Sequence, residues 1–409
     1  MRKLILLMLV ILIALPAYAG LDFKDLKLNG HYRLRGYSIN NADNDASVGD
    51  INRYFRQRIW LGTEGNVAEN VFFSATAEHE KEWGKDNMDA VPGSKGDFSL
   101  VYGYVKLSKL FAKDLTLTVG RQPYQLNKNN FVIWDNANGL DGMTLCYKTG
   151  NWDLDALYLK VDEVIGGDDI DDQEFYGVVA NYKGFEGHKI QGYILLDRDA
   201  SGVAGGDESD LKQYVGIRAE GNIKSVPGLS YIGEYINLSG DNGQINETDY
   251  KSSLLYAYAG YEFKDMKNFK ILADYLWATG DEDPADDEQE AFQASSVAGN
   301  QMLEGNINFD FGMDAAKCAG VTYSNIKALG IGASVKPTEK LTLGAKYSML
   351  EEDEGKDIGN NFDIYASYKM SDKYSLCAGY SMFDCDDEYK TPAPDDKTDV
   401  LAAELRINF

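Results

Sequence analysis

The chain ends on the stretch Leu401-Ala-Ala-Glu-Leu-Arg-Ile-Asn-Phe409. Every second residue of this stretch is apolar, whereas Glu404, Arg406 and Asn408 lie between the apolar positions. Side chains of a β-strand point alternately to its two faces. The stretch therefore predicts a strand with one apolar and one polar face, and the strand ends on an aromatic residue.

Such a strand resembles the closing strand of a bacterial outer-membrane β-barrel, whose apolar face meets lipid and whose polar face lines the lumen. A sheet can cross lipid only when it closes, because an open edge leaves backbone groups unpaired. At the other end, Arg2 and Lys3 precede an apolar run and the small-x-small pattern Ala17-Tyr18-Ala19. This pattern predicts a secretory signal peptide over residues 1–19 and a mature chain over residues 20–409.

Windows of about ten residues with period-two alternation run along the whole mature chain, from Leu26–Ser38 to Leu401–Phe409. We count eighteen of them. The connections alternate between short and long, as expected for periplasmic turns and extracellular loops. The predicted fold is an all-β, transmembrane, antiparallel up-and-down barrel of about eighteen strands, placed in the cell outer membrane, with a polar inward face throughout.

Charge separates between the two kinds of connection. The chain has a net charge of −25, and the acids gather in the long connections while lysines gather in the short ones. A strongly acidic exported protein does not bind nucleic acid through a basic patch. We expect its partners to be outer-membrane lipid, lipopolysaccharide, the barrel assembly machinery and small hydrophilic solutes. The acidic mouth also predicts a preference for cations at low salt.

Two stretches are similar to the alginate-export porin family. One is Arg53-Tyr-Phe-Arg-Gln-Arg-Ile-Trp-Leu-Gly62, and the other is Leu115-Thr-Leu-Thr-Val-Gly-Arg-Gln122 followed by Trp134-Asp-Asn-Ala-Asn-Gly-Leu-Asp-Gly142. The resemblance covers residues 53–147 and implies an eighteen-stranded export barrel. An alginate exporter needs a strongly cationic lumen to pass a polyuronate, whereas the inward positions of this chain carry both acids and bases.

The candidate pore-lining residues are charged residues at inward positions. They are Arg33, Arg35, Arg56, Arg58, Glu64, Glu78, Glu80, Arg218 and Glu220. The four N-terminal arginines face one way on two adjacent strands, which suits them to anionic groups of a solute. The alternative interpretation is cross-strand pairing of these arginines with the three N-terminal glutamates, because charges inside a lumen must be paired or hydrated.

The remaining candidates lie mostly in the long connections. Asp168, Asp169, Asp171 and Asp172 form a weak candidate calcium site, although solvation alone also explains them. Cys318 and Cys385 are expected to form a disulfide across the outer mouth. The connection 279–324 either constricts the mouth or remains external. No cofactor is expected, and the three histidines show no catalytic or metal-binding spacing, so an enzyme is not expected.

The leading hypothesis is therefore an outer-membrane porin for passive diffusion of small hydrophilic solutes or ions. Barrels of about 16–18 strands leave an aqueous channel. Two alternatives remain: a sheath around a transmembrane electron carrier such as a multihaem cytochrome, and an alginate-like polysaccharide export channel. By the same resemblance to outer-membrane barrels, Phe409 is expected to act as the assembly signal.

Overall fold

The computed structural model describes residues 25–42, 51–84, 98–129, 131–134, 139–162, 172–200, 209–243, 248–298, 315–318, 321–386, 389 and 397–409. The predicted signal peptide, residues 1–19, lies outside these ranges, so its cleavage stays a prediction. Within the described ranges, no helix is long and apolar enough to cross a membrane.

Eighteen long strands, one two-residue strand and one helical turn make up the described structure. Their bounds are β1 (Lys27–Asn40), β2 (Ile51–Ala68), β3 (Val71–Glu82), β4 (Ser99–Ser108), β5 (Leu115–Gln122), β6 (Leu140–Thr149), β7 (Trp152–Asp162), β8 (Gln173–Tyr182), β9 (His188–Asp199), β10 (Asp210–Asn222), β11 (Leu229–Asp241), β12 (Asp249–Phe263), β13 (Phe269–Ala278), β14 (Glu288–Gln289), α3 (Ala315–Cys318), β15 (Ile326–Val335), β16 (Leu341–Glu351), β17 (Asp357–Lys369), β18 (Tyr374–Cys385) and β19 (Thr398–Asn408). The long strands coincide with the eighteen predicted windows to within a few residues at each end.

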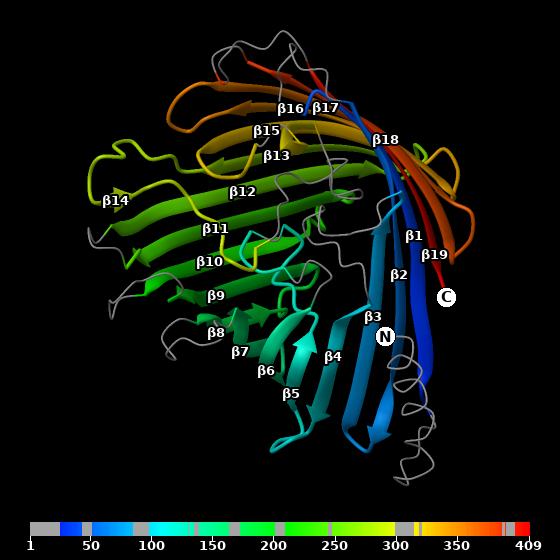
Figure 1. Cartoon of the computed structure of the whole chain (residues 1–409), viewed down its shortest axis with the longest axis vertical. Helices are drawn as coiled ribbons and strands as arrows, with labels where there is room; N and C mark the ends of the chain where they lie inside the picture. The colour runs from blue at the N-terminus through cyan, green and yellow to red at the C-terminus, as the bar shows by residue number, and fades with distance from the viewer. Residues whose placement is uncertain are drawn as a thin grey trace.

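The long strands form one closed ring. Each pairs in antiparallel fashion with its neighbours in the sequence, and β19 pairs with β1, with Tyr32 opposite Ile407. Figure 1 shows β1 and β19 side by side at the seam of the barrel. The short strand β14 is an addition, because it pairs in parallel with the start of β12. Closure gives every strand two partners, which the backbone requires in lipid.

The outward face is apolar, as predicted for a surface that meets lipid. Ile217, Ile331 and Leu401 are each more than half exposed on this face. Aromatic residues such as Trp152 and Tyr374 lie at strand ends beside the short turns, where an amphipathic ring suits the headgroup level.

The prediction of a polar inward face throughout is wrong for β7–β13. Leu159, Leu195, Tyr214 and Leu238 occupy inward positions of these strands and are almost fully buried. They are buried because two long connections fold into the lumen and pack against them. In Figure 1 the teal segment after β5 is drawn inside the barrel. The inward apolar residues thus mark the part of the wall that the loops cover.

Candidate functional site: a charged wall facing two inward loops

Four arginines meet on the lumen side of β1 and β2, as the sequence predicts. The strand register places Arg33 opposite Arg58 and Arg35 opposite Arg56. Like charges directly opposite each other destabilise a sheet. This arrangement therefore requires acidic side chains on the neighbouring strands.

Strand β3 supplies the acids on one side of the arginines. Glu80 accepts hydrogen bonds from Arg33 and from Arg58, each at 3.0 Å. Glu78 lies 3.0 Å from the Nε of Arg58 and also accepts a hydrogen bond from the indole of Trp60. Both glutamates are buried. The two like-charged arginines are thus held together by a shared acidic partner.

Strand β19 supplies the acid on the other side. Glu404 accepts a hydrogen bond from the Nε of Arg35 at 2.5 Å, and its second oxygen lies 2.8 Å from Arg406. Across β3, β2, β1 and β19 the lumen surface therefore runs from acid to base and back to acid. We call this surface the charged wall, and its residues are Arg33, Arg35, Arg56, Arg58, Glu78, Glu80, Glu404 and Arg406.

The structure thus supports the pairing interpretation of the arginines, with one correction to the residues involved. Glu64 does not pair with them, because it lies six residues beyond Arg58 on β2, opposite Lys27 and Ser74. Glu404 pairs with Arg35 instead. Alternation places Glu404 on the lumen face, but which charges meet depends on barrel closure, which joins the two ends of the chain.

A second ion pair lies across the lumen from the charged wall. In a ring of eighteen strands, β10 and β11 stand opposite β1 and β2. Arg218 on β10 donates to Glu234 on β11 at 2.8 Å, and both side chains are almost completely buried. Glu220 also binds Arg218, at 2.9 Å, and remains partly exposed. Arg218 therefore does not line an open lumen as predicted, whereas Glu220 does face a cavity.

The loop over residues 123–134 covers this ion pair. Asn129 accepts a hydrogen bond from Arg218 at 2.8 Å, and Asn127 donates to Glu234 at 2.8 Å. The backbone carbonyl of Leu126 accepts a hydrogen bond from Gln191 at 3.1 Å. The loop is thus fixed to β9, β10 and β11 through polar contacts to the buried ion pair and to Gln191.

The start of the longest connection, residues 279–298, lies beside the first loop. The backbone N of Trp134 donates to the carbonyl of Val297 at 2.7 Å. Ser296 donates to Asp197 on β9 through its backbone N and its hydroxyl, at 2.7 and 2.9 Å. The described part of this connection therefore folds inward, which favours constriction over an external loop.

An apolar cluster fills the space between the two inward loops and strands β10 and β12. Phe131 packs edge-on against Tyr256 and Tyr323, with ring centroids 5.7 Å apart in both pairs. Phe292 contacts Tyr214 and Tyr323 and is completely buried. The rings of this cluster are almost fully buried.

Asp353 fastens the beginning of the 279–298 segment to the barrel. Its carboxylate accepts hydrogen bonds from the backbone N of Gly280 at 3.1 Å and from Trp277 at 2.7 Å, and it lies 2.9 Å from the ammonium of Lys327. Burial alone would raise the pKa of Asp353, but these donors hold the pKa below its ordinary value of 3.8.

Two predicted sites lie partly outside the described residues. Asp168, Asp169 and Asp171 are outside, and Asp172 forms an ion pair with Lys160; within the described chain, no cluster suited to a metal ion occurs. The calcium site stays a prediction. The side chain of Cys318 is also outside, so its bridge to Cys385 stays a prediction, although α3 packs against β18, the strand that ends at Cys385.

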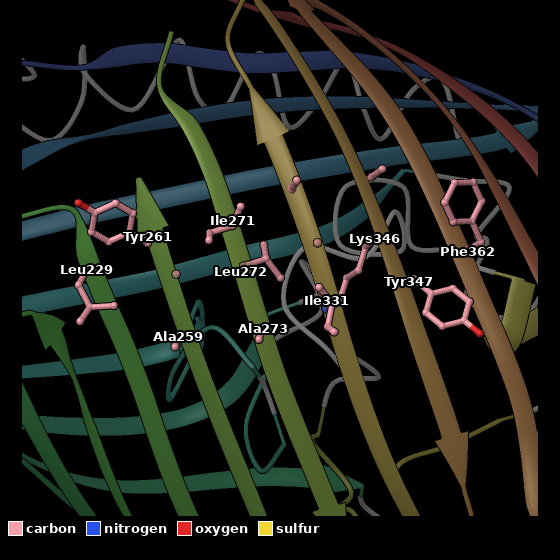
Figure 2. Close-up of a pocket in the computed structure, with 14 residues that line it drawn as sticks. Leu229, Ala259, Tyr261, Ile271, Leu272, Ala273, Ile331, Lys346, Tyr347 and Phe362 are labelled. Atoms are coloured by element: carbon pink, nitrogen blue, oxygen red, sulfur yellow. The ribbon is translucent and has the colours of Figure 1, made fainter. Parts of the chain in front are cut away.

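A depression of about 680 Å³ lies on the outer face of the barrel, away from the charged wall. Figure 2 shows Ala259, Ala273 and Ile331 along it, with Tyr261 and Tyr347 at its rim. Its exposed residues face lipid and its surface is almost wholly apolar. It is a hollow in the outward surface and lies apart from the charged wall.

The sequence comparisons were made against protein families and curated proteins. The family model described as alginate export matches residues 24–351, which is most of the chain. This chain belongs to the alginate export family. No curated protein matches the chain.

Solved structures show the same fold at low sequence identity. The outer-membrane protein opdK of Pseudomonas aeruginosa is 11% identical with a TM-score of 0.65, covering 95% of this chain and 99% of opdK. OccAB2 of Acinetobacter baumannii is 15% identical with a TM-score of 0.61, covering 94% and 98%. OccK8 of Pseudomonas aeruginosa is 11% identical with a TM-score of 0.62, covering 95% and 98%. This alginate export family member has the β-barrel fold of these outer-membrane proteins.

Proposed function

We propose that this alginate export family member lets small hydrophilic solutes diffuse passively through a narrow, water-filled route. The route runs between the charged wall and the inward loops. The observation that carries this proposal is the asymmetry of the cross-section. One side is sealed by Phe131, Phe292 and Tyr323, whereas the other side presents paired charges that water and polar solutes can solvate.

The charge balance of the wall argues for small solutes over a polyuronate. Glu78, Glu80 and Glu404 are engaged with the arginines through the ion pairs described above. A long polyanion would meet these carboxylates at the same time as the arginines, and like charges close together cost free energy. The wall is therefore better suited to small solutes that touch it at one point.

The inward loops also argue against a sheath around an electron carrier. A sheath must leave its interior to the protein that it surrounds, but here the chain's own 123–134 and 279–298 segments occupy part of that interior. They are anchored to the wall by buried hydrogen bonds. A second protein in the lumen would have to break these contacts.

A catalytic role is not supported by the histidines, which are the usual general bases. His31 packs against Trp60, His79 against Phe98 and His188 against Tyr231. Each histidine ring is thus held against an aromatic side chain, which is a structural role. We infer that the chain transports solutes and does not transform them.

Liposome swelling tests the proposed function. Vesicles with the purified protein are diluted into isotonic solutions of uncharged sugars of increasing size. We expect rapid swelling with pentoses and a steep decline with di- and trisaccharides. Swelling that is no faster than in protein-free vesicles for every sugar would overturn the proposal. Equal rates for all sizes would show that the loops do not constrict the lumen.

A further inference from the structure

A cavity of about 660 Å³ lies inside the barrel at the end that carries the short turns. Four lysines from four segments line it: Lys128 on the 123–134 loop, Lys183 after β8, Lys189 on β9 and Lys270 on β13. A second cavity of about 220 Å³ adjoins it and shares Lys183 and Lys189. We call the first cavity the inner vestibule. The strand pattern does not predict it, because Lys128 reaches it only through the inward fold of its loop.

Two of the four lysines are paired with carboxylates on neighbouring barrel strands. Lys183 forms an ion pair with Asp153 on β7. Lys189 lies 4.0 Å from Glu220, and the other oxygen of Glu220 is bound by Arg218 at 2.9 Å. The positive charge of this side of the vestibule is therefore largely balanced by its own carboxylates.

The other two lysines have no paired carboxylate among the described residues, although Glu262 lies opposite Lys270 in the strand register. Lys128 is exposed at the tip of its loop, and the Nζ of Lys270 lies 5.3 Å from the centroid of the Tyr258 ring. In the described part of the chain, neither forms an ion pair with a carboxylate. The remaining acid at this cavity, Glu186, pairs with Lys224 at the rim. Lys128 and Lys270 thus give the vestibule an excess of positive charge.

We propose that the inner vestibule binds a small oxyanion group, a carboxylate or a phosphate, through Lys128 and Lys270. An ammonium group offers three donors and a point charge to such a group. A partly enclosed cavity also strengthens the attraction relative to bulk water. That the bound oxyanion belongs to a passing solute rests on the proposed diffusion function. The binding of the oxyanion does not rest on that function.

The line width of the ³¹P resonance of inorganic phosphate tests the binding directly, with the full protein in detergent micelles at low salt. The variants are Lys128→Gln, Lys270→Gln and the double variant. Lys373→Gln, an exposed turn lysine elsewhere on the same rim, is the matched control. Acetate and glycerol, added as competitors in separate titrations, distinguish a general oxyanion site from a phosphate-specific one.

We expect wild type and the control variant to broaden the phosphate resonance. At a fixed phosphate concentration the double variant should need about tenfold more protein for the same broadening, which corresponds to about 1.4 kcal/mol, and acetate but not glycerol should compete. Equal broadening by wild type and the double variant would overturn the site, as would an equal loss in the control variant. Because this readout does not depend on conduction, loss of binding and loss of channel function are seen separately.

Discussion

Glu234 accepts hydrogen bonds from three segments of the chain. Arg218 donates to it at 2.8 Å, Asn127 at 2.8 Å and Tyr193 at 2.9 Å. The residue therefore joins β10, β9 and the 123–134 loop at one buried point. Removing one partner of a buried ion pair leaves the other charge uncompensated, which costs far more than the pair itself contributes.

We expect Glu234→Ala to lower the free energy of unfolding by about 3 kcal/mol. Urea unfolding in lipid vesicles, followed by tryptophan fluorescence, measures this change. Glu186→Ala is the matched control, because Glu186 is 88% exposed and its ion pair with Lys224 lies on the surface, where such pairs contribute little. A Glu234 variant as stable as the Glu186 variant would show that the loop is not held through this carboxylate.

The carboxyl of Asp353 predicts a pH dependence of loop anchoring. Its pKa in the folded protein lies below the ordinary value of 3.8. The stabilisation from the charged form is therefore complete above pH 3.8 and is lost as the pH falls below 3.8 through the folded pKa. Limited proteolysis within residues 281–290 should accelerate in that range, and Asp353→Asn should be cleaved faster already at pH 7. A cleavage rate of Asp353→Asn equal to wild type at pH 7 would contradict this role.

At the scale of single elements, the seam between β1 and β19 is closed by the last residue. The backbone N and carbonyl of Phe409 both hydrogen-bond Gly30, each at 3.0 Å. A side chain at Gly30 would meet the carbonyl of Trp60 at 2.3 Å and the Phe409 ring at 2.8 Å. The close approach of the aromatic ring thus requires glycine at this point of β1.

Deleting Phe409 should impair assembly more than its burial indicates. The ring is 54% exposed, so its burial contributes only a couple of kcal/mol. We nevertheless expect a several-fold loss of folded, heat-modifiable protein in the outer membrane. Phe111→Ala, in a short turn and 88% exposed, serves as the control. Equal amounts of folded wild type and deletion variant would show that the terminal residue is not the assembly signal.

Strand positions could be predicted from the sequence because lipid imposes period-two alternation on every strand. The 123–134 loop could not, because its seal depends on which distant wall it meets. The sequence signal for a covering loop is a strand with apolar residues on both faces. In β7, Leu157 and Leu159 face inward while Leu154 and Tyr158 face outward. An inward leucine in an aqueous lumen indicates that something covers it. Likewise, Glu404 meets Arg35 only because the barrel closes.

At the scale of the whole molecule, the two mouths carry opposite charge. The outer connections hold acids such as Asp283, Asp287 and Glu354, whereas the inner vestibule holds the surplus lysines Lys128 and Lys270. A field of this kind is screened over about 10 Å at 0.1 M salt. The acidic outer mouth is the larger feature, so we retain the prediction of cation preference at low salt.

Reversal potentials across a potassium chloride gradient measure this preference. We expect a cation-selective potential at 0.1 M that weakens towards 1 M, together with a current that rectifies at low salt. The variant Lys128→Gln should shift the potential further towards cations, since it removes positive charge from the inner mouth. An anion-selective potential at low salt would mean that the charged wall, and not the outer mouth, sets selectivity.

The single-channel conductance of the purified protein in planar bilayers tests the central claim most directly. The claim is that a narrow aqueous route runs past the charged wall while the apolar cluster seals the rest. We predict steady, small conductance steps for wild type, and larger steps for Phe292→Ala, which opens a cavity in the seal. Bilayers that stay sealed with wild-type protein, or steps of equal size in wild type and Phe292→Ala, would contradict the account.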